Sequence, residues 1–146
     1  MSGFVDESIL SDFVAESREH LDGIEPDLLE MEGQGSDVSH ETVNRVFRAI
    51  HSIKGNAGFL ALDAVKELSH VMESVLMLVR DGELSITQDM MDVLLRGVDK
   101  LRAMVDDIEA SDSVPCQDEI RQLQAILDAH SADGSSHERK REEPSE

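Results

Sequence analysis

The sequence is poor in several residue types, and each shortage narrows what the protein can be. Cys116 is the one cysteine among 146 residues, so no disulfide can form within the chain. No apolar run is long enough for the core of a signal peptide or for a membrane span. We therefore expect a protein of a reducing compartment, the cytoplasm.

Positive charge is also scarce. The chain has 13 lysines and arginines against 32 aspartates and glutamates, which gives a formal net charge of -19. Proteins that hold nucleic acid or an anionic membrane surface need clustered cations. The charge balance argues against both roles and favours another protein as the partner.

Aromatic side chains are few as well. The chain has four phenylalanines and no tyrosine or tryptophan, although 40% of its residues are hydrophobic. Its core must therefore be built from Leu, Ile, Val, Met and Ala, a palette that favours helices. A chain of this length is the size of a single domain.

Apolar residues recur at intervals of three and four in five segments, which is the pattern of amphipathic helices. The first segment runs from Leu10 to Met31. Pro26 lies inside it and lacks a backbone N–H, so we expect a bend or a break between Gly23 and Pro26.

The next two helices are close in sequence. One begins near Ser39 and ends at Phe59 or Leu60, and the other covers roughly residues 63–80, with Gly82 placed as its C-terminal cap. The apolar face of the first of these two contains Val43, Val46, Phe47, Ile50, Ile53 and Ala57. The short connection predicts an antiparallel hairpin.

The last two helices have recognisable starts. Residues 85–88, Ser-Ile-Thr-Gln, have the form of a capping box before a helix that continues to Ile108. Pro115 fits the first turn of a fifth helix that ends at His130. We predict an all-α fold, an antiparallel four-helix bundle with an additional fifth C-terminal helix, in one domain covering residues 1–130.

The end of the chain differs in composition. Residues 131–146 contain no apolar side chain larger than Ala132 and are crowded with Ser, Glu, Arg and Lys. Such a segment cannot bury enough apolar surface to order itself. We expect a disordered tail or the start of an interdomain linker.

The second helix carries a histidine beside two glycines. Gly55 and Gly58 follow His51 at i+4 and i+7, so the three residues share one helix face. Each glycine costs about 1 kcal/mol relative to alanine in a helix interior. A bare backbone beside His51 would allow a large partner to approach, which offsets that cost.

The same helix is basic within an acidic chain. Arg45, Arg48 and Lys54 face only Glu41 as an acid. Arg48 and Lys54 lie about one turn to either side of His51, where they could offset the charge of a phosphoryl group on the imidazole. Arg45 and Arg48 could also simply pair with Glu41 or with acids of the first helix, and for Arg45 this is the better explanation.

The third helix offers a carboxylate that could orient the imidazole. His51 precedes the turn near Ala61 by ten positions, and Glu73 follows it by twelve, so the two can meet across the hairpin. Glu73 would accept a hydrogen bond from the Nδ1–H of His51 and leave Nε2 free to attack phosphorus. Glu73 could also be a solvated acid, and His70, one turn before it, a surface residue.

These residues carry a family resemblance. The run FRAIHSIKGNAG at residues 47–58, followed by LSHVME at residues 68–73, resembles the histidine phosphotransfer (HPt) domain at the N-terminus of CheA-type chemotaxis histidine kinases. The resemblance spans about residues 4–130. It implies that His51 is phosphorylated, that Glu73 orients it, that Lys54 lies near the phosphoryl group and that His70 belongs to the same polar network.

The resemblance also implies partners. An ATP-binding kinase domain outside this chain, acting from a second subunit, would phosphorylate His51, and response regulators of the CheY and CheB type would receive the phosphoryl group. Arg48, Gly55 and Gly58 would form the docking face. We expect no cofactor or metal in this domain, no autonomous catalysis and a monomeric state, within a larger protein histidine kinase.

Three other interpretations remain open at this point. The domain could belong to a multistep phosphorelay, or it could be a helical adaptor without phosphate chemistry. A metal-binding bundle could use His70 and Glu73, although the usual helical motif is Glu-x-x-His, repeated on two helices. The two glycines beside His51 could also serve only close helix packing.

Overall fold

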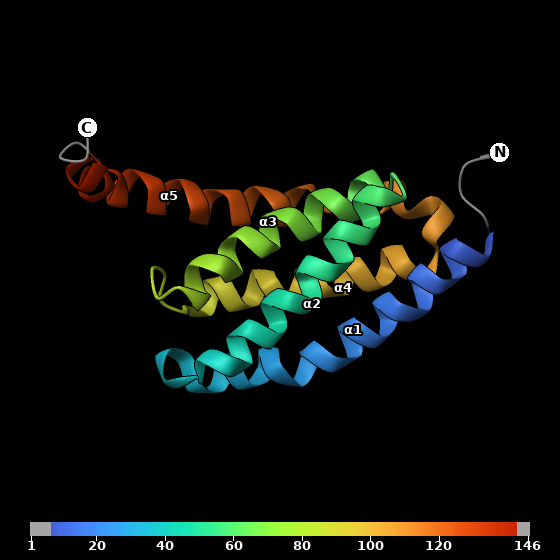
Figure 1. The fold of residues 1–146 in the computed structure, drawn as a ribbon, viewed down its shortest axis with the longest axis horizontal. Coiled ribbons are helices and arrows are strands. Elements are labelled where there is room, and N and C mark those ends of the chain that lie inside the picture. The colour runs from blue at the N-terminus through green and yellow to red at the C-terminus, as the bar shows by residue number, and fades with distance from the viewer. Residues whose placement is uncertain (1–6, 143–146) are drawn as a thin grey trace.

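The computed structural model describes residues 7–142, and for residues 36 and 133–142 the backbone alone. This part of the chain contains helices and no strand. The α-helices are α1 (Glu7–Gln34), α2 (His40–Phe59), α3 (Asp63–Arg80), α4 (Gln88–Asp106) and α5 (Gln117–Glu142), with short 3₁₀ helices η1 (Gly35–Asp37) and η2 (Ile108–Ser113) between them (Figure 1). The predicted all-α class is confirmed.

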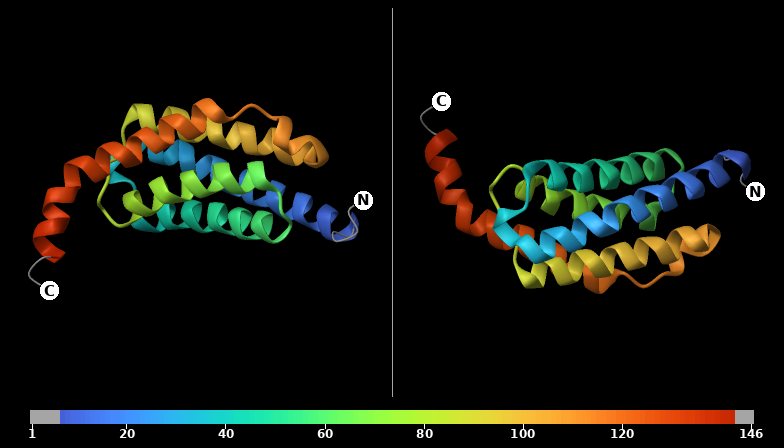
Figure 2. Two further views of the ribbon diagram at one scale, coloured as in Figure 1. Left: turned by 90° about the horizontal axis from the view of Figure 1, so that it is seen from above. Right: turned by 90° about the horizontal axis from the view of Figure 1, so that it is seen from below.

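The first four helices form the predicted bundle. In it α1 packs against α2 and α4, and α3 packs against α2 and α4. The fifth helix, α5, lies along α3 and α4, and its C-terminal part extends past the end of the bundle (Figure 2). Along residues 7–142, no helix combines the length and the apolar character needed to cross a membrane.

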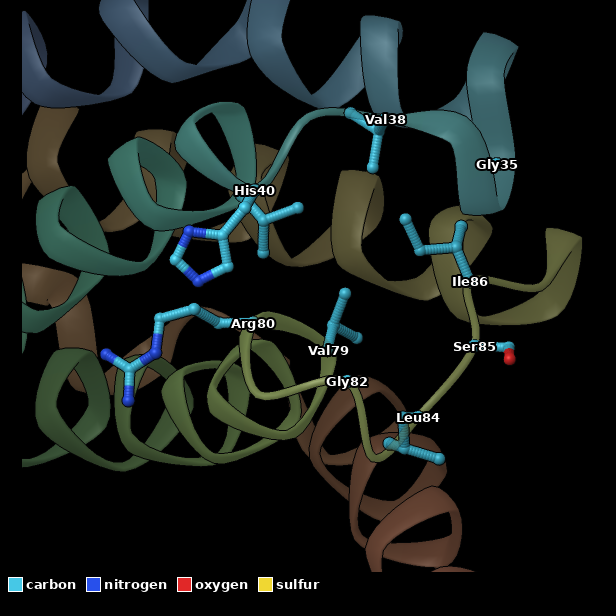
Figure 3. A pocket seen from close by; sticks show the side chains of 10 residues that line it. Gly35, Val38, His40, Val79, Arg80, Gly82, Leu84, Ser85 and Ile86 are labelled. Atoms are coloured by element: carbon cyan, nitrogen blue, oxygen red, sulfur yellow. The ribbon is translucent and has the colours of Figure 1, made fainter.

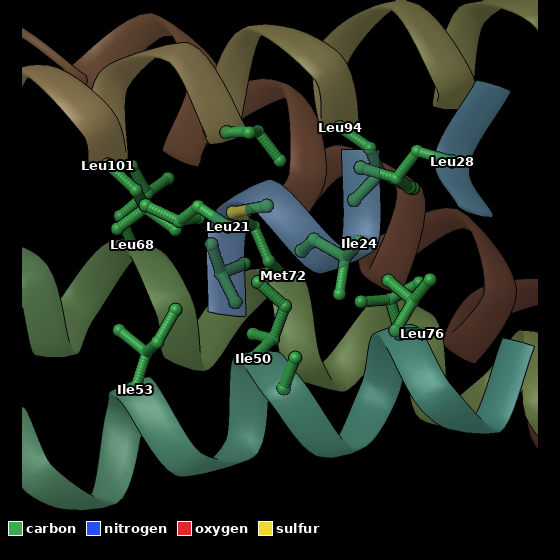
Figure 4. Packing of buried hydrophobic residues seen from close by; sticks show 14 of the residues in the cluster. Leu21, Ile24, Leu28, Ile50, Ile53, Leu68, Met72, Leu76, Leu94 and Leu101 are labelled. Atoms are coloured by element: carbon green, nitrogen blue, oxygen red, sulfur yellow. The ribbon is translucent and has the colours of Figure 1, made fainter. Parts of the chain in front are cut away.

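The core is built mainly from aliphatic side chains, as the composition predicts. Fully buried residues come from each of the four bundle helices: Leu21 and Leu28, Ile50 and Ile53, Leu68 and Leu76, Leu94 and Leu101 (Figure 4). Each set recurs at helical spacing, so every helix turns one apolar stripe inward. The core fixes the relative position of α2 and α3, which carry the candidate site.

The predicted break in the first helix is absent. α1 is one continuous helix with Pro26 inside it. Pro26 and Asp22 are both exposed, so water can replace the helical donor that the Asp22 carbonyl loses. Ile24 and Leu28 on either side of Pro26 are buried in the core, and this packing holds the helix together.

Two predicted helix starts need correction. Thr87, not Ser85, caps α4, because the Thr87 hydroxyl accepts from the Met90 backbone N–H at 3.1 Å. Pro115 lies just before α5, which begins at Gln117. The fourth helix ends at Asp106, and Ile108 opens η2 instead of continuing it.

The fifth helix is longer than predicted and ends at Glu142 instead of His130. The segment contains Ala, Glu, Arg and Lys, which favour helix, and a helix already formed by packing extends at one hydrogen bond per residue. Whether residues 131–146 serve as a linker stays a prediction, and residues 143–146 of that tail lie outside the described part.

Candidate functional site

His51 stands on the solvent side of α2. Its neighbours Ile50 and Ile53 are fully buried, whereas the His51 side chain is 58% exposed. The helix that carries it is anchored at its start by Ser39, whose hydroxyl accepts from the Thr42 N–H at 3.1 Å. His51 is therefore accessible to a large partner while its helix is held in the bundle.

Glu73 joins His51 to Lys54. It lies on α3 with a side chain only 8% exposed, and its Oε2 pairs with Nδ1 of His51. Its other oxygen, Oε1, pairs with Nζ of Lys54 at 2.6 Å. Both carboxylate oxygens are thus engaged, and three predicted site residues meet across the α2–α3 hairpin.

The surroundings of Glu73 keep it ionised. Burial alone would raise the pKa of Glu73, but hydrogen bonds from Lys54 and His51, together with the charge of Lys54, hold that pKa below its ordinary value. An ionised carboxylate only accepts hydrogen bonds, so the proton of a neutral imidazole resides on Nδ1. Nε2 of His51 then carries the lone pair on a largely exposed side chain, where it is available as a nucleophile.

His70 lies at the edge of this group. Its Nδ1 is 3.9 Å from Oε1 of Glu73, which is longer than a hydrogen bond, and its side chain is 65% exposed. His70 is close enough for an electrostatic interaction with Glu73 but makes no hydrogen bond that would orient the Glu73 carboxylate. Its place in the polar network stays a prediction.

The predicted cations have separate surroundings. Arg45 donates to both carboxylate oxygens of Asp27 on α1, at 3.0 and 3.1 Å, as the sequence suggests. Arg48 is exposed, and it lines a shallow pocket between α1 and α2. No ion pair joins it to another side chain within the described part of the chain. Arg48 thus remains available to an external anion.

The two glycines are not required by packing inside the domain. A Cβ added at Gly55 would meet nothing within 4 Å, and one at Gly58 would make ordinary contact with the Lys66 side chain at 3.6 Å. The interpretation that both serve close helix packing is therefore wrong. Both are exposed, one and two turns beyond His51.

Two further residues contact the site without having been singled out. Phe47, predicted on the inward face, is only half-buried, and its ring stacks on His51 with centroids 5.9 Å apart and planes 17° apart. The guanidinium carbon of Arg80, on α3, lies 4.3 Å from the centre of the Phe47 ring. The i, i+4 spacing of Phe47 and His51 is the sequence signal that could have revealed the stack.

Arg80 also lines a pocket at one end of the bundle, together with His40 and Val38 near the start of α2 and Leu84 and Ile86 from the α3–α4 connection (Figure 3).

Among the described residues, no group of three His, Cys, Asp or Glu side chains is placed to hold a metal ion.

Several known proteins with similar sequences are named CheA or CheAY. The chain is 36% identical over 127 residues to the sensor histidine kinase CheAY of Helicobacter pylori, covering 82% of this chain and 16% of that protein. It is 33% identical over 129 residues to the chemotaxis protein CheA of Halobacterium salinarum, covering 87% and 19%. The chain thus spans less than a fifth of the length of these relatives.

Solved structures agree on the fold. The phosphorylated P1 domain of CheA3 in complex with CheY6 from R. sphaeroides aligns with a TM-score of 0.75 and 27% identity, over 86% of this chain and all of that chain. A solution structure of the histidine phosphotransfer domain of CheA aligns with a TM-score of 0.72 and 32% identity, over 84% and 93%. The sequence profile of the Hpt domain matches residues 8–133. The chain belongs to the Hpt domain family.

Proposed function

We propose that this domain is the phosphoacceptor domain of a CheA-type two-component histidine kinase. His51 takes a phosphoryl group from ATP held by a separate kinase domain and passes it to an aspartate of a response regulator. The observation that carries this proposal is the bond between Nδ1 of His51 and the buried carboxylate of Glu73. It leaves Nε2 as the nucleophile on an exposed side chain.

The chemistry needs little from this chain beyond that arrangement. The Nε2 lone pair attacks the γ-phosphorus, a P–N bond forms, and the P–O bond to ADP breaks with its electron pair on ADP. In the second step an aspartate oxygen of the receiver attacks the same phosphorus and the P–N bond breaks. ATP binding and metal ions belong to the partners in both steps.

Basic groups would stabilise the phosphorylated state. Lys54 has three N–H donors and uses one on Glu73, so others can reach a phosphoryl oxygen on His51. Arg48, one turn before His51, can lie near the same charge. Such electrostatic help, with positioning, is the usual contribution of protein groups to phosphoryl transfer.

The partners follow from the exposed surface and from the relatives. The P1 domain of CheA3 was captured with CheY6, which supports a receiver domain as the partner. On this chain Gly55 and Gly58 bare the backbone next to His51, and Phe59 exposes 84% of its surface at the end of α2. The domain acts as a monomer in the cytoplasm, without nucleic acid.

The decisive experiment is phosphorylation by a CheA-type kinase domain with radioactive ATP. His51→Gln should abolish acid-labile, base-stable labelling, because the nucleophile is lost, and Glu73→Ala should slow labelling without abolishing it. His40→Gln, at the start of the same helix but outside the site, is the matched control and should label normally. Undiminished labelling of His51→Gln would refute the proposal.

A phosphorelay HPt domain remains the second candidate. The relatives favour the CheA type, because each is a chemotaxis kinase several times longer than this chain. Reading the gene beyond Glu146 separates the two: dimerisation, ATP-binding and coupling domains would identify a CheA-type kinase.

A further inference from the structure

We infer that Phe47 and Arg80 are positioning residues that hold the His51 imidazole in its reactive orientation. The inference rests on the proposed function of His51 and adds two residues to its mechanism. It begins from two contacts in series: the stack of Phe47 on His51, and the guanidinium of Arg80 over the Phe47 ring.

An exposed imidazole needs more than one contact to be held in a single orientation. The bond from Nδ1 to Glu73 fixes one atom of the ring, but the ring can still turn about that bond. Phe47 lies one helical turn earlier and faces the ring nearly in parallel, at 17°. The stack fixes the plane of the imidazole, and the two contacts together set the direction of Nε2.

Arg80 in turn restrains Phe47. The Phe47 ring packs against the core but is only half-buried, so the core does not surround it. Arg80 follows Glu73 by seven residues, which places both on the same face of α3, and its guanidinium carbon lies 4.3 Å from the Phe47 ring centre. This cation–π contact from α3 restrains the Phe47 ring on α2.

The Arg80 side chain is only 26% exposed, and most residues of the pocket that it lines are apolar. Nε of Arg80 donates to Asp81 at 3.1 Å, and His40 shares the rim of the pocket that Arg80 lines (Figure 3). Asp81 is the residue after Arg80 and does not tie it to another helix. The contact with Phe47 is therefore the one that links Arg80 to the site.

The chemical consequence concerns the tautomer of His51. Without the stack the imidazole turns more freely about its bond to Glu73, and that bond is broken in a larger share of the molecules. An imidazole without that bond prefers to carry its proton on Nε2. A protonated Nε2 has no lone pair to attack phosphorus. Loss of the stack should therefore lower the rate of the chemical step, not the binding of the domain to its kinase.

The test uses variants that separate ring, charge and volume. Phe47→Leu removes the ring but keeps apolar volume, and Phe47→Tyr restores the ring. Arg80→Gln removes the cation and Arg80→Lys keeps it. Asp81→Asn removes only the negative charge that Arg80 pairs with. The readouts are the ¹⁵N chemical shifts of the His51 imidazole, and kcat and KM for the domain as substrate of a CheA-type kinase domain.

We expect Phe47→Leu to shift His51 towards the Nε2–H tautomer and to lower kcat on the order of tenfold, with KM unchanged. Arg80→Gln should lower kcat about twofold to fivefold. Phe47→Tyr, Arg80→Lys and Asp81→Asn should match the parent domain. Rescue by tyrosine but not by leucine is a result that simple core packing does not produce.

A parent-like tautomer and kcat in Phe47→Leu would overturn the inference. If that variant does not fold, Arg80→Gln decides by the same readouts, because its side chain is not part of the core. The tautomer is measured on the unphosphorylated domain, so it tests the positioning role even if labelling of His51→Gln refutes the proposed function. Normal labelling with an unchanged tautomer refutes only the positioning role.

Discussion

Glu73 is a buried, ionised carboxylate that both pairs with Lys54 and orients the reactive His51. A carboxylate taken out of water is costly unless hydrogen-bonded cations or donors satisfy it, and here Lys54 and His51 occupy one oxygen each. The result is a pKa for Glu73 below the ordinary value. The same interactions that orient His51 therefore contribute to the stability of the fold.

The first prediction concerns the pH dependence of that contribution. Because the pKa of Glu73 is lower in the folded than in the unfolded chain, folding is favoured by the ionised form. The contribution is complete above the unfolded pKa of about 4.3 and is lost as pH falls through the folded value. Relative to Glu73→Gln, the parent domain should lose stability in that acidic window.

Urea unfolding of both proteins between pH 7 and pH 3 measures the difference in the free energy of unfolding. The difference should be constant above about pH 5 and should shrink at lower pH. Glu67→Gln, an exposed acid on the same helix, is the control. A difference that does not change with pH would show that Glu73 is not held ionised by its neighbours.

The second prediction compares the same substitution at two helical glycines. Gly55→Ala should raise the free energy of unfolding by about 0.5–1 kcal/mol, because the new Cβ meets nothing within 4 Å and alanine favours helix. Gly97→Ala should lower it by about 1–2 kcal/mol, because its Cβ would lie 2.8 Å from Sδ of the buried Met72. Urea unfolding decides both signs.

Gly55→Ala should slow phosphoryl transfer from the domain even though it raises the free energy of unfolding. If the bare backbone serves docking, Gly55→Ala should slow transfer from phosphorylated His51 to a CheY-type receiver, although the domain is more stable. Transfer from the parent domain, timed by loss of label, is the reference. An alanine variant that is both more stable and equally fast would remove Gly55 from the docking face.

The sequence predicts the polar part of the site better than its aromatic part. Counting positions from the hairpin turn is enough to bring Glu73 to His51, because two antiparallel helices with a short connection have little freedom in register. Arg80 over Phe47 depends on side-chain directions across two helices, which spacing does not define. Phe47 also fits an apolar stripe, so its periodicity alone suggests core.

At the scale of the helices, caps explain where prediction succeeds and fails. The predicted start of the second helix near Ser39 is confirmed, because the Ser39 hydroxyl caps α2. Before α4 both Ser85 and Thr87 are suitable, and local sequence favours the wrong one. The start of α3 lacks a cap from its own N-cap residue, and Asp112 of η2 accepts from the Ala64 N–H at 3.1 Å instead. A contact across 48 residues has no local signal.

The third prediction tests the cap of α4. Thr87→Ala should lower the free energy of unfolding by about 1 kcal/mol, because the Met90 N–H loses its acceptor. Ser85→Ala, two residues earlier, is the matched control and should change stability by less than about 0.5 kcal/mol, since Ser85 is exposed and outside the helix. Equal losses in the two variants would restore Ser85 as a capping residue.

At the scale of the whole molecule, α5 covers one face of the bundle. Leu123 is fully buried, and the flanking residues Ile120, Ile126 and Leu127 pack against the same core. α5 contacts α3 and α4, whereas His51 lies on α2. The helix is thus a structural cover for the face of the bundle away from α2.

The last prediction separates this cover from the tail that follows it. A fragment of residues 1–132 should have a free energy of unfolding within about 0.5 kcal/mol of that of the full chain. The core side chains of α5 end at Leu127, and His130 keeps its contact with Glu83 at 3.4 Å. Residues 1–113 should lose about 4 kcal/mol or more, because the fully buried Leu123 contributes about 1.5–3 kcal/mol and the partly buried Ile120, Ile126 and Leu127 each contribute a smaller amount. Urea unfolding measures both, and the ¹⁵N shifts of His51 report whether the α2–α3 site survives. A large loss for residues 1–132 would move the domain boundary beyond Ala132, because it would require stabilising contacts from the segment now assigned to the tail.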